Sequence, residues 1–175
     1  MGRSVTLFDS SGARLACANI EQSWELMPVV QARPRTSAPT VTNAPTSRPT
    51  NRLRATFDFE KDGVTGTIDM YQPDPSRPTA VAVMIVGAVG STDKGKSFGQ
   101  YHVHEFPRDP THPDGPCSVG AVGGHWNPFG APYKCDTKNP GTCEVGDLSG
   151  KHGEFTGSFF TASYQDGFLP LSGQY

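Results

Sequence analysis

Apolar and polar side chains alternate along much of the chain with a period of two, which is typical of half-buried β-strands. The first two such stretches are joined by the short turn 10–13 and predict a hairpin. A second hairpin is predicted around residues 60–63, where Asp62-Gly63 is a strong turn signal. The predicted strands are residues 4–9, 14–22, 53–60, 64–72, 79–90, 100–106, 153–163 and 167–175. No helix-length segment has a 3.6-residue period, so we expect an all-β sandwich or Greek-key barrel.

Residues 31–52 interrupt this pattern with Pro, Thr, Ser, Ala and Arg and almost no large apolar side chain. Such a composition predicts a disordered or polyproline II-like linker. We therefore divide the chain into an N-terminal strand pair (1–27), a linker (28–52) and a main β-domain (53–175).

Charge is distributed unevenly along the chain. The net charge is −2, yet residues 31–54 hold five arginines and no acid, so the remainder is acidic. A nucleic-acid-binding domain presents a basic face, so we expect no nucleic-acid partner. No stretch of 18 apolar residues occurs, and we therefore expect no membrane span.

The chain has four cysteines, at positions 17, 117, 135 and 143, and none has the C-x-x-C spacing of a zinc ribbon. Two disulfides are the better interpretation, with three pairings open, and they predict a location outside the cytosol. The N-terminal residues lack the apolar core of a signal peptide, so we expect the chain to be a segment of a longer precursor.

Residues 100–106 read QYHVHEF, so His102 and His104 would project from the same face of a strand, about 7 Å apart. With one more histidine they would form a three-imidazole metal site, which suits copper, zinc, iron or nickel. The alternative is a solvated strand face, because short H-x-H patterns arise often by chance.

Three motifs in succession, YHVHEF, GGHWNPFG and VGDLSG, resemble the copper/zinc superoxide dismutase family. In that family the first motif supplies two copper ligands, and the histidine before Asn-Pro supplies a third. The resemblance covers residues 53–175 and implies that His102, His104 and His125 bind one copper ion. It also implies the family's Greek-key β-barrel and its activity, the conversion of superoxide into O2 and hydrogen peroxide.

Residues 2–20 resemble the C-terminal portion of the same family, so the closing strands of the barrel stand at the N-terminus of this chain. The resemblance implies that Arg14 attracts superoxide and that Cys17 is joined to Cys117. Arg14 could equally be an exposed hairpin cation. Three arrangements remain open: a tandem array cut across two neighbouring domains, a permuted domain, and strands swapped into a second chain.

Two departures from the family pattern concern the metal. Two-metal members have further histidines between His125 and the Val-Gly-Asp motif, and this chain has none. It resembles the copper-only members and their repeat proteins in this, which implies copper without zinc. Cys135 and Cys143 would then brace the loop by a local disulfide. Glu144 or Asp147 would accept a hydrogen bond from His125; alternatively, Glu144 is an ordinary loop carboxylate.

The second departure is Phe8, which stands where the family's GRSVVIH segment has its fourth copper-binding histidine. Three imidazoles can hold Cu(I), whereas Cu(II) prefers four tetragonal ligands. His112 and His152 lie in turn-like segments and are poor substitutes. The leading hypothesis is an extracellular or cell-surface copper-only superoxide dismutase. The alternatives are a copper-binding or structural module with little turnover and, third, a scaffold without metal.

Overall fold

The structure is a computed structural model that describes residues 2–9, 11–23, 51–87, 98–132, 135–155 and 157–172. The predicted linker, 28–52, lies outside the described residues except for its last two. The second of these, Arg52, is the first residue of a strand.

The described residues form seven strands and three α-helices of four or five residues each. The strands are β1 (Ser4–Asp9), β2 (Arg14–Gln22), β3 (Arg52–Phe57), β4 (Val64–Tyr71), β5 (Thr79–Gly87), β6 (Phe98–His104) and β7 (Phe159–Asp166). The helices are α1 (Phe59–Asp62), α2 (Val119–Val122) and α3 (Leu148–His152), and a 3-10 turn spans Pro140–Thr142. The all-β fold class is confirmed.

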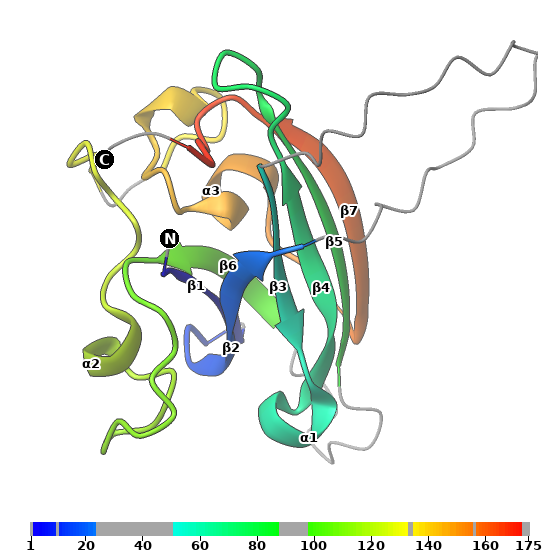
Figure 1. Cartoon of the computed structure of the whole chain (residues 1–175), viewed down its shortest axis with the longest axis vertical. Coiled ribbons are helices and arrows are strands. Elements are labelled where there is room, and N and C mark those ends of the chain that lie inside the picture. Colours follow the sequence, from blue (N-terminus) through cyan, green and yellow to red (C-terminus); the bar gives the residue numbers. More distant parts are fainter. Residues whose placement is uncertain are drawn as a thin grey trace, which may run out of the picture.

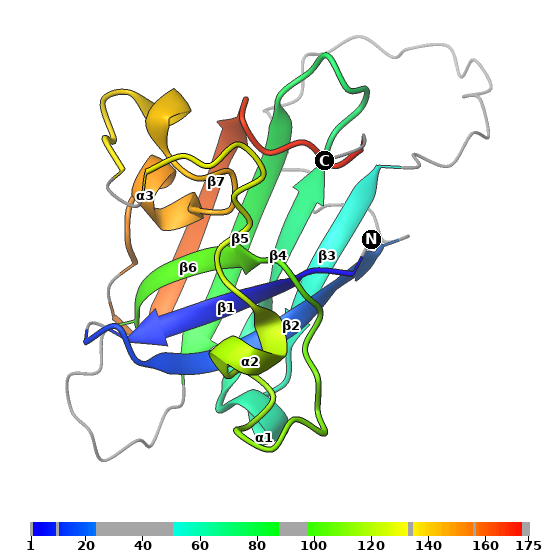
Figure 2. The ribbon, with the colours of Figure 1, turned by 90° about the vertical axis from the view of Figure 1, so that its left-hand side faces the viewer.

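All seven strands belong to one antiparallel sheet in the order β6-β1-β2-β3-β4-β5-β7. The sheet curls into two layers: β6, β1 and β2 lie to the left of β3, β4, β5 and β7 in Figure 1 and cross in front of them in Figure 2. Strand β2 takes part in both layers, because residues 14–19 pair with β1 and residues 20–22 pair with β3. β1 also pairs with β6, so the N-terminal hairpin completes the sheet of its own chain.

The core lies between the two layers of the sheet. Leu7 and Tyr101 from one layer and Ile68 and Ile85 from the other are fully buried members of a single apolar cluster. Every residue of β1 is buried, although its side chains alternate between the two faces of the sheet. Both faces of this strand are therefore covered, one by the core and the other by loops that carry the site described below.

Some predicted element bounds are wrong. The strand expected at 53–60 ends at Phe57, and Phe59–Asp62 form α1, with the Asp58 side chain accepting from the Glu60 amide at 3.0 Å. A single helical turn is too short to show a 3.6-residue period. The strands expected at 153–163 and 167–175 are replaced by β7, and the described residues 167–172 form turns and irregular chain. No helix in the described part of the chain has the length and apolarity needed to cross a membrane.

Candidate metal centre

Strand β6 points two histidines away from the core. Tyr101 and Val103 face the apolar core, so His102 and His104 project from the opposite face, as the period of two predicts. Both histidines are nevertheless buried, with 4% and 0% of their surface exposed. They are covered because loops that follow β6 fold back over this outer face of the sheet.

A cycle of three backbone hydrogen bonds brings those loops to β6. The amide of Val103 donates to Gly146 O at 2.8 Å, the amide of Gly146 to Trp126 O at 2.8 Å, and the amide of Trp126 to Val103 O at 2.9 Å. The cycle needs glycine at 146, since a Cβ there would lie 2.3 Å from Val103 O. It places His125 beside His104 and Asp147 beside His102, where each pair forms an isolated β-bridge.

The result is a cluster of three imidazoles, in which one ligand nitrogen each of His102, His104 and His125 lies within 4.8 Å of the others. The predicted ligand residues are thus brought together. The other two histidines lie elsewhere. His112 Nδ1 accepts from the Asp114 amide at 3.3 Å, and His152 Nε2 is 3.0 Å from Asp166 Oδ2.

One nitrogen of each clustered imidazole is held by the protein. His102 Nε2 lies 3.1 Å from Ser149 Oγ and 3.2 Å from Asp147 Oδ1. His104 Nδ1 lies 3.1 Å from the carbonyl oxygen of Gly123, and His125 Nδ1 lies 2.6 Å from Glu144 Oε2. These partners fix the orientation of each ring, as is usual around metal-binding histidines.

The opposite nitrogens are the ones that a metal would take. His102 Nδ1 and His104 Nε2 are buried and have no hydrogen-bond partner among the described residues. A buried nitrogen without a partner is costly unless it binds something. Together with Nε2 of His125, these atoms give a three-nitrogen donor set that fits a copper ion.

Burial favours the neutral forms of His104 and His125, and metal binding requires neutral imidazoles. The pKa of His104 is lowered to about 3, chiefly by burial; the nearby His125 and Arg14 act in the same direction, while the hydrogen bond with Gly123 O opposes the shift. Burial also lowers the pKa of His125, and the charge of His102 acts in the same direction, while Glu144 opposes the shift. Burial tends to raise the pKa of Asp147, but hydrogen bonds from His102 and the Gly150 amide outweigh it and leave that pKa lowered.

Glu144 and Asp147 are both bonded to histidines of the cluster, but to different ones. Glu144 bonds His125 and also accepts from Asn127 Nδ2 at 3.1 Å, which ties it to the loop that carries His125. Asp147 lies against His102, and it caps α3 by accepting from the Gly150 amide at 2.7 Å. The carboxylate bonded to His125 is therefore Glu144.

Phe8 lies among the three histidines, on the same face of the sheet. Its ring centroid is 5.1 Å from that of His102, 5.9 Å from that of His104 and 6.5 Å from that of His125. The Arg14 guanidinium lies 5.6 Å from the centre of the Phe8 ring, because these two residues pair across the β1–β2 hairpin. Burial lowers the pKa of Arg14, which nevertheless stays charged at neutral pH.

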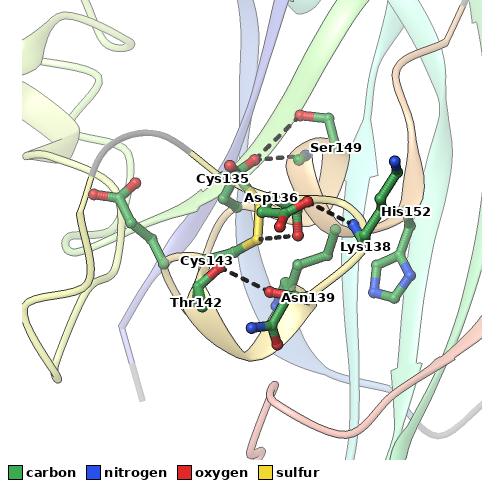
Figure 3. The surroundings of a disulfide bond; sticks show 12 residues. Cys135, Asp136, Lys138, Asn139, Thr142, Cys143, Ser149 and His152 are labelled. Carbon is green, nitrogen blue, oxygen red and sulfur yellow. Dashed lines mark hydrogen bonds between the residues drawn. A yellow bond between two sulfur atoms is a disulfide. The ribbon is translucent and has the colours of Figure 1, made fainter.

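Two disulfides connect the surrounding loops. Cys17 of β2 is bonded to Cys117, 100 residues later, just before α2. Cys135 is bonded to Cys143, the residue before Glu144, around a turn in which the Thr142 hydroxyl donates to Asn139 O at 2.8 Å (Figure 3). Both bonds lie within the one chain.

Sequence reasoning missed Ser149, Gly146 and the pair Lys151–Asp166 near the site. Ser149 belongs to the VGDLSG motif, in which the sequence predicts a histidine contact for the aspartate alone. Lys151 and Asp166 carry no sequence signal, because a lone charge on a short helix or at the end of a strand predicts a solvated position.

The curled all-β sheet and the three-histidine cluster are similar to those of copper-only superoxide dismutases. The chain is 33% identical over 112 residues to the "Cell surface Cu-only superoxide dismutase 5" of Candida albicans, a match that covers 64% of this chain and 44% of that protein. It is 43% identical over 81 residues to the "Cell surface superoxide dismutase [Cu-Zn] 6" of the same organism, covering 46% of this chain and 23% of that one.

Solved structures agree with these sequence matches. Candida albicans superoxide dismutase 5 with Cu(II) superposes with a TM-score of 0.54 at 28% identity, over 70% of this chain and 72% of that one. Two variants of that protein, each with a single glutamate replaced, are also similar. No family model matches the sequence. The chain spans less than half the length of the curated relatives named above.

Proposed function

We propose that this chain binds one copper ion through His102, His104 and His125 and disproportionates superoxide. The observation that carries the proposal is the cluster of three ligand nitrogens within 4.8 Å, on rings whose other nitrogens are held by protein atoms. Copper, when bound, supplies the one-electron redox couple. Two superoxide anions and two protons give one O2 and one hydrogen peroxide, with no other reactant consumed.

A single copper without zinc is supported by the donor groups. The three histidines are the one group of at least three His, Cys, Asp or Glu residues in the described ranges with ligand atoms close enough to share an ion. Glu144 bonds the Nδ1 of His125, so a carboxylate stands next to this ring where a second metal would otherwise bind it. Two of the relatives are named as Cu-only enzymes.

Arg14 is proposed to attract the superoxide anion. Its guanidinium lies beside the Phe8 ring, and its charge acts on His104. It also lines an open cleft of about 340 Å³, whose charged lining is mixed: Lys61 and Arg108 lie there with Asp62 and Asp114, and none of the three histidines does. A positive charge beside the metal position raises the rate at which an anion arrives, and it does so less as salt is added.

Glu144 and His125 are proposed to manage the protons that peroxide needs. The His125 Nδ1 and Glu144 Oε2 atoms are 2.6 Å apart, which is a short charge-assisted hydrogen bond. The side chains are 19% and 12% exposed, so protons can reach the pair from solvent. A proton held on His125 Nδ1 is thus shared with Glu144 while Nε2 faces the metal position.

An extracellular or cell-surface location is supported by the two disulfides, which persist in oxidising compartments. The curated relatives are themselves named as cell-surface proteins. Closure of the sheet by its own β1–β2 hairpin is proposed over closure by a neighbouring repeat or a swapped partner chain. Disulfide mapping of purified protein should give the Cys17–Cys117 link within monomers; the same link between two chains would show swapping.

The test of function is stopped-flow decay of superoxide with copper-loaded protein. We expect catalytic decay that the same copper concentration with saturating EDTA and no protein does not reproduce. A His102→Ala, His104→Ala variant should lose both copper binding and activity. Arg14→Ala should slow decay and flatten its dependence on ionic strength. Protein that binds copper stoichiometrically and leaves the decay rate unchanged would be a copper-binding module, and this outcome would exclude the dismutase.

A further inference from the structure

The helix α3 is only five residues long, yet it carries two of the groups that hold His102. Asp147 is its N-cap and Ser149 lies in its first turn, and both lie within about hydrogen-bond distance of His102 Nε2. A helix of this length has no stability of its own, so its position must come from tertiary contacts.

Leu148 of α3 is buried in the apolar core, and a second contact that fixes α3 is a fully buried ion pair. Lys151 Nζ lies 2.7 Å from Asp166 Oδ2 at the end of β7, and both side chains are 0% exposed. The same ammonium group donates to the carbonyl oxygen of Val145 at 2.7 Å. Val145 lies between Glu144 and Gly146, so one side chain joins the metal-site loop, α3 and the far edge of the sheet.

Asp166 is held in turn by further donors. Its Oδ1 accepts from the Phe168 amide at 2.7 Å, and its Oδ2 lies 3.0 Å from His152 Nε2. The His152 ring stacks on Tyr164 of β7, with centroids 3.9 Å apart and the planes 18° apart. The carboxylate is thus fixed from three directions, as a rigid anchor for Lys151 requires.

Overall stability does not explain this pair. Burying an ammonium and a carboxylate loses their hydration, and apolar residues of similar volume are often as stabilising or more so. A buried pair does, however, define one geometry, because either group alone would be an uncompensated buried charge. The pair contacts Val145 and α3. These belong to residues 144–152, the segment whose side chains orient the rings of His102 and His125.

We propose that Lys151 and Asp166 are positioning residues that hold the ring of His102 in its metal-binding orientation through α3. This inference rests on the proposed copper site. Lys151 fixes Val145 and the last turn of α3, and these keep Asp147 and Ser149 against His102 Nε2. Neither Lys151 nor Asp166 touches the metal position.

The experiment compares Lys151→Met and Asp166→Asn with Val83→Ala, a core variant on β5 chosen to lose a similar amount of thermal stability. Copper affinity is measured by competition with a chelator, and the Cu(II) EPR spectrum is recorded for each. We expect the two charge variants to lose about 10- to 100-fold in affinity and to give broadened, heterogeneous spectra. Val83→Ala should keep the wild-type affinity within about twofold at a temperature where it is folded.

A double-mutant cycle with Asp147→Ala separates positioning from general loosening. If Lys151 acts through α3, Lys151→Met should reduce affinity much less in the Asp147→Ala background than in the wild type. Equal loss in both backgrounds, or equal loss in Val83→Ala, overturns the proposal.

A metal-free measurement keeps the inference separate from the proposed function. The ring proton and 15N signals of His102 in the apo protein should be sharp and slowly exchanging in wild type and Val83→Ala. They should broaden in Lys151→Met and Asp166→Asn. Unchanged His102 signals in these two variants overturn the positioning role, whereas wild-type protein that binds no copper overturns the proposed function alone.

Discussion

The ring of Phe8 lies 5.1 Å from the ring of His102, centroid to centroid, on the side of the three-histidine cluster formed by β1. Phe8 is 8% exposed, so its ring fills this side of the site instead of leaving it to water. The position that the family resemblance assigns to a fourth ligand is therefore adjacent to the site, and it is occupied by a side chain that cannot coordinate.

Replacing Phe8 by histidine should raise the affinity for Cu(II) by at least about tenfold, because Cu(II) prefers four tetragonal ligands. The affinity for Cu(I), which accepts three, should change less. Both are measured by chelator competition, with EPR to count the nitrogens around Cu(II). Phe8→Leu is the matched control, since it keeps an apolar side chain and adds no donor. Equal Cu(II) affinity in wild type and Phe8→His would contradict this account.

Gly146→Ala should disturb the site and the fold together. The added Cβ would lie 2.3 Å from Val103 O and 3.0 Å from the Trp126 amide nitrogen, so the hydrogen-bond cycle must open. We expect a loss of about 1–3 kcal/mol in the free energy of unfolding and weaker copper binding. The measurement is urea denaturation with copper titration. Gly167→Ala, where a Cβ meets nothing within 4 Å, should stay within about 0.5 kcal/mol of wild type.

The stability of the metal-free protein should fall as pH decreases from about 6.5. Burial lowers the pKa of His104 from 6.5 to about 3. Between these values the unfolded chain binds a proton at this residue and the folded chain does not, so stability is lost as pH falls. The contribution of His104 between pH 6.5 and 4 is on the order of 3 kcal/mol. Urea denaturation at several pH values gives the free energy of unfolding as a function of pH, and its slope should be shallower for His104→Leu than for wild type. An identical slope would contradict a lowered pKa of His104.

Removing the long-range disulfide should destabilise the protein more than removing the local one. Cys17–Cys117 closes a loop of sequence separation 100, whereas Cys135–Cys143 closes one of 8. The loop-closure entropy predicts losses of about 4–5 and about 2–3 kcal/mol for the respective serine pairs. Denaturation of the two double variants under identical oxidising conditions gives the comparison. The prediction fails if the Cys135→Ser, Cys143→Ser protein is the less stable of the two.

The orientation of His102 and His104 could be read from the sequence, because the period of a strand puts alternate side chains on one face. Their burial could not, since it depends on loops more than 15 residues away in the chain. His125 was assigned from the family resemblance, and no local pattern would have brought it to β6. The extra turn α1 was missed because four residues are too few to show a helical period.

The family resemblance, and not a local pattern, marked Phe8 as standing in place of a ligand. By itself, the sequence determined the all-β class and the shared face of the two strand histidines. These are local properties, set by backbone periodicity and residue chemistry. Only the tertiary structure decided that the N-terminal hairpin completes its own sheet and that Gly146 joins three segments through its backbone. It also revealed the burial of Lys151 against Asp166. Such features depend on contacts between residues distant in sequence, whose free energies no local pattern encodes.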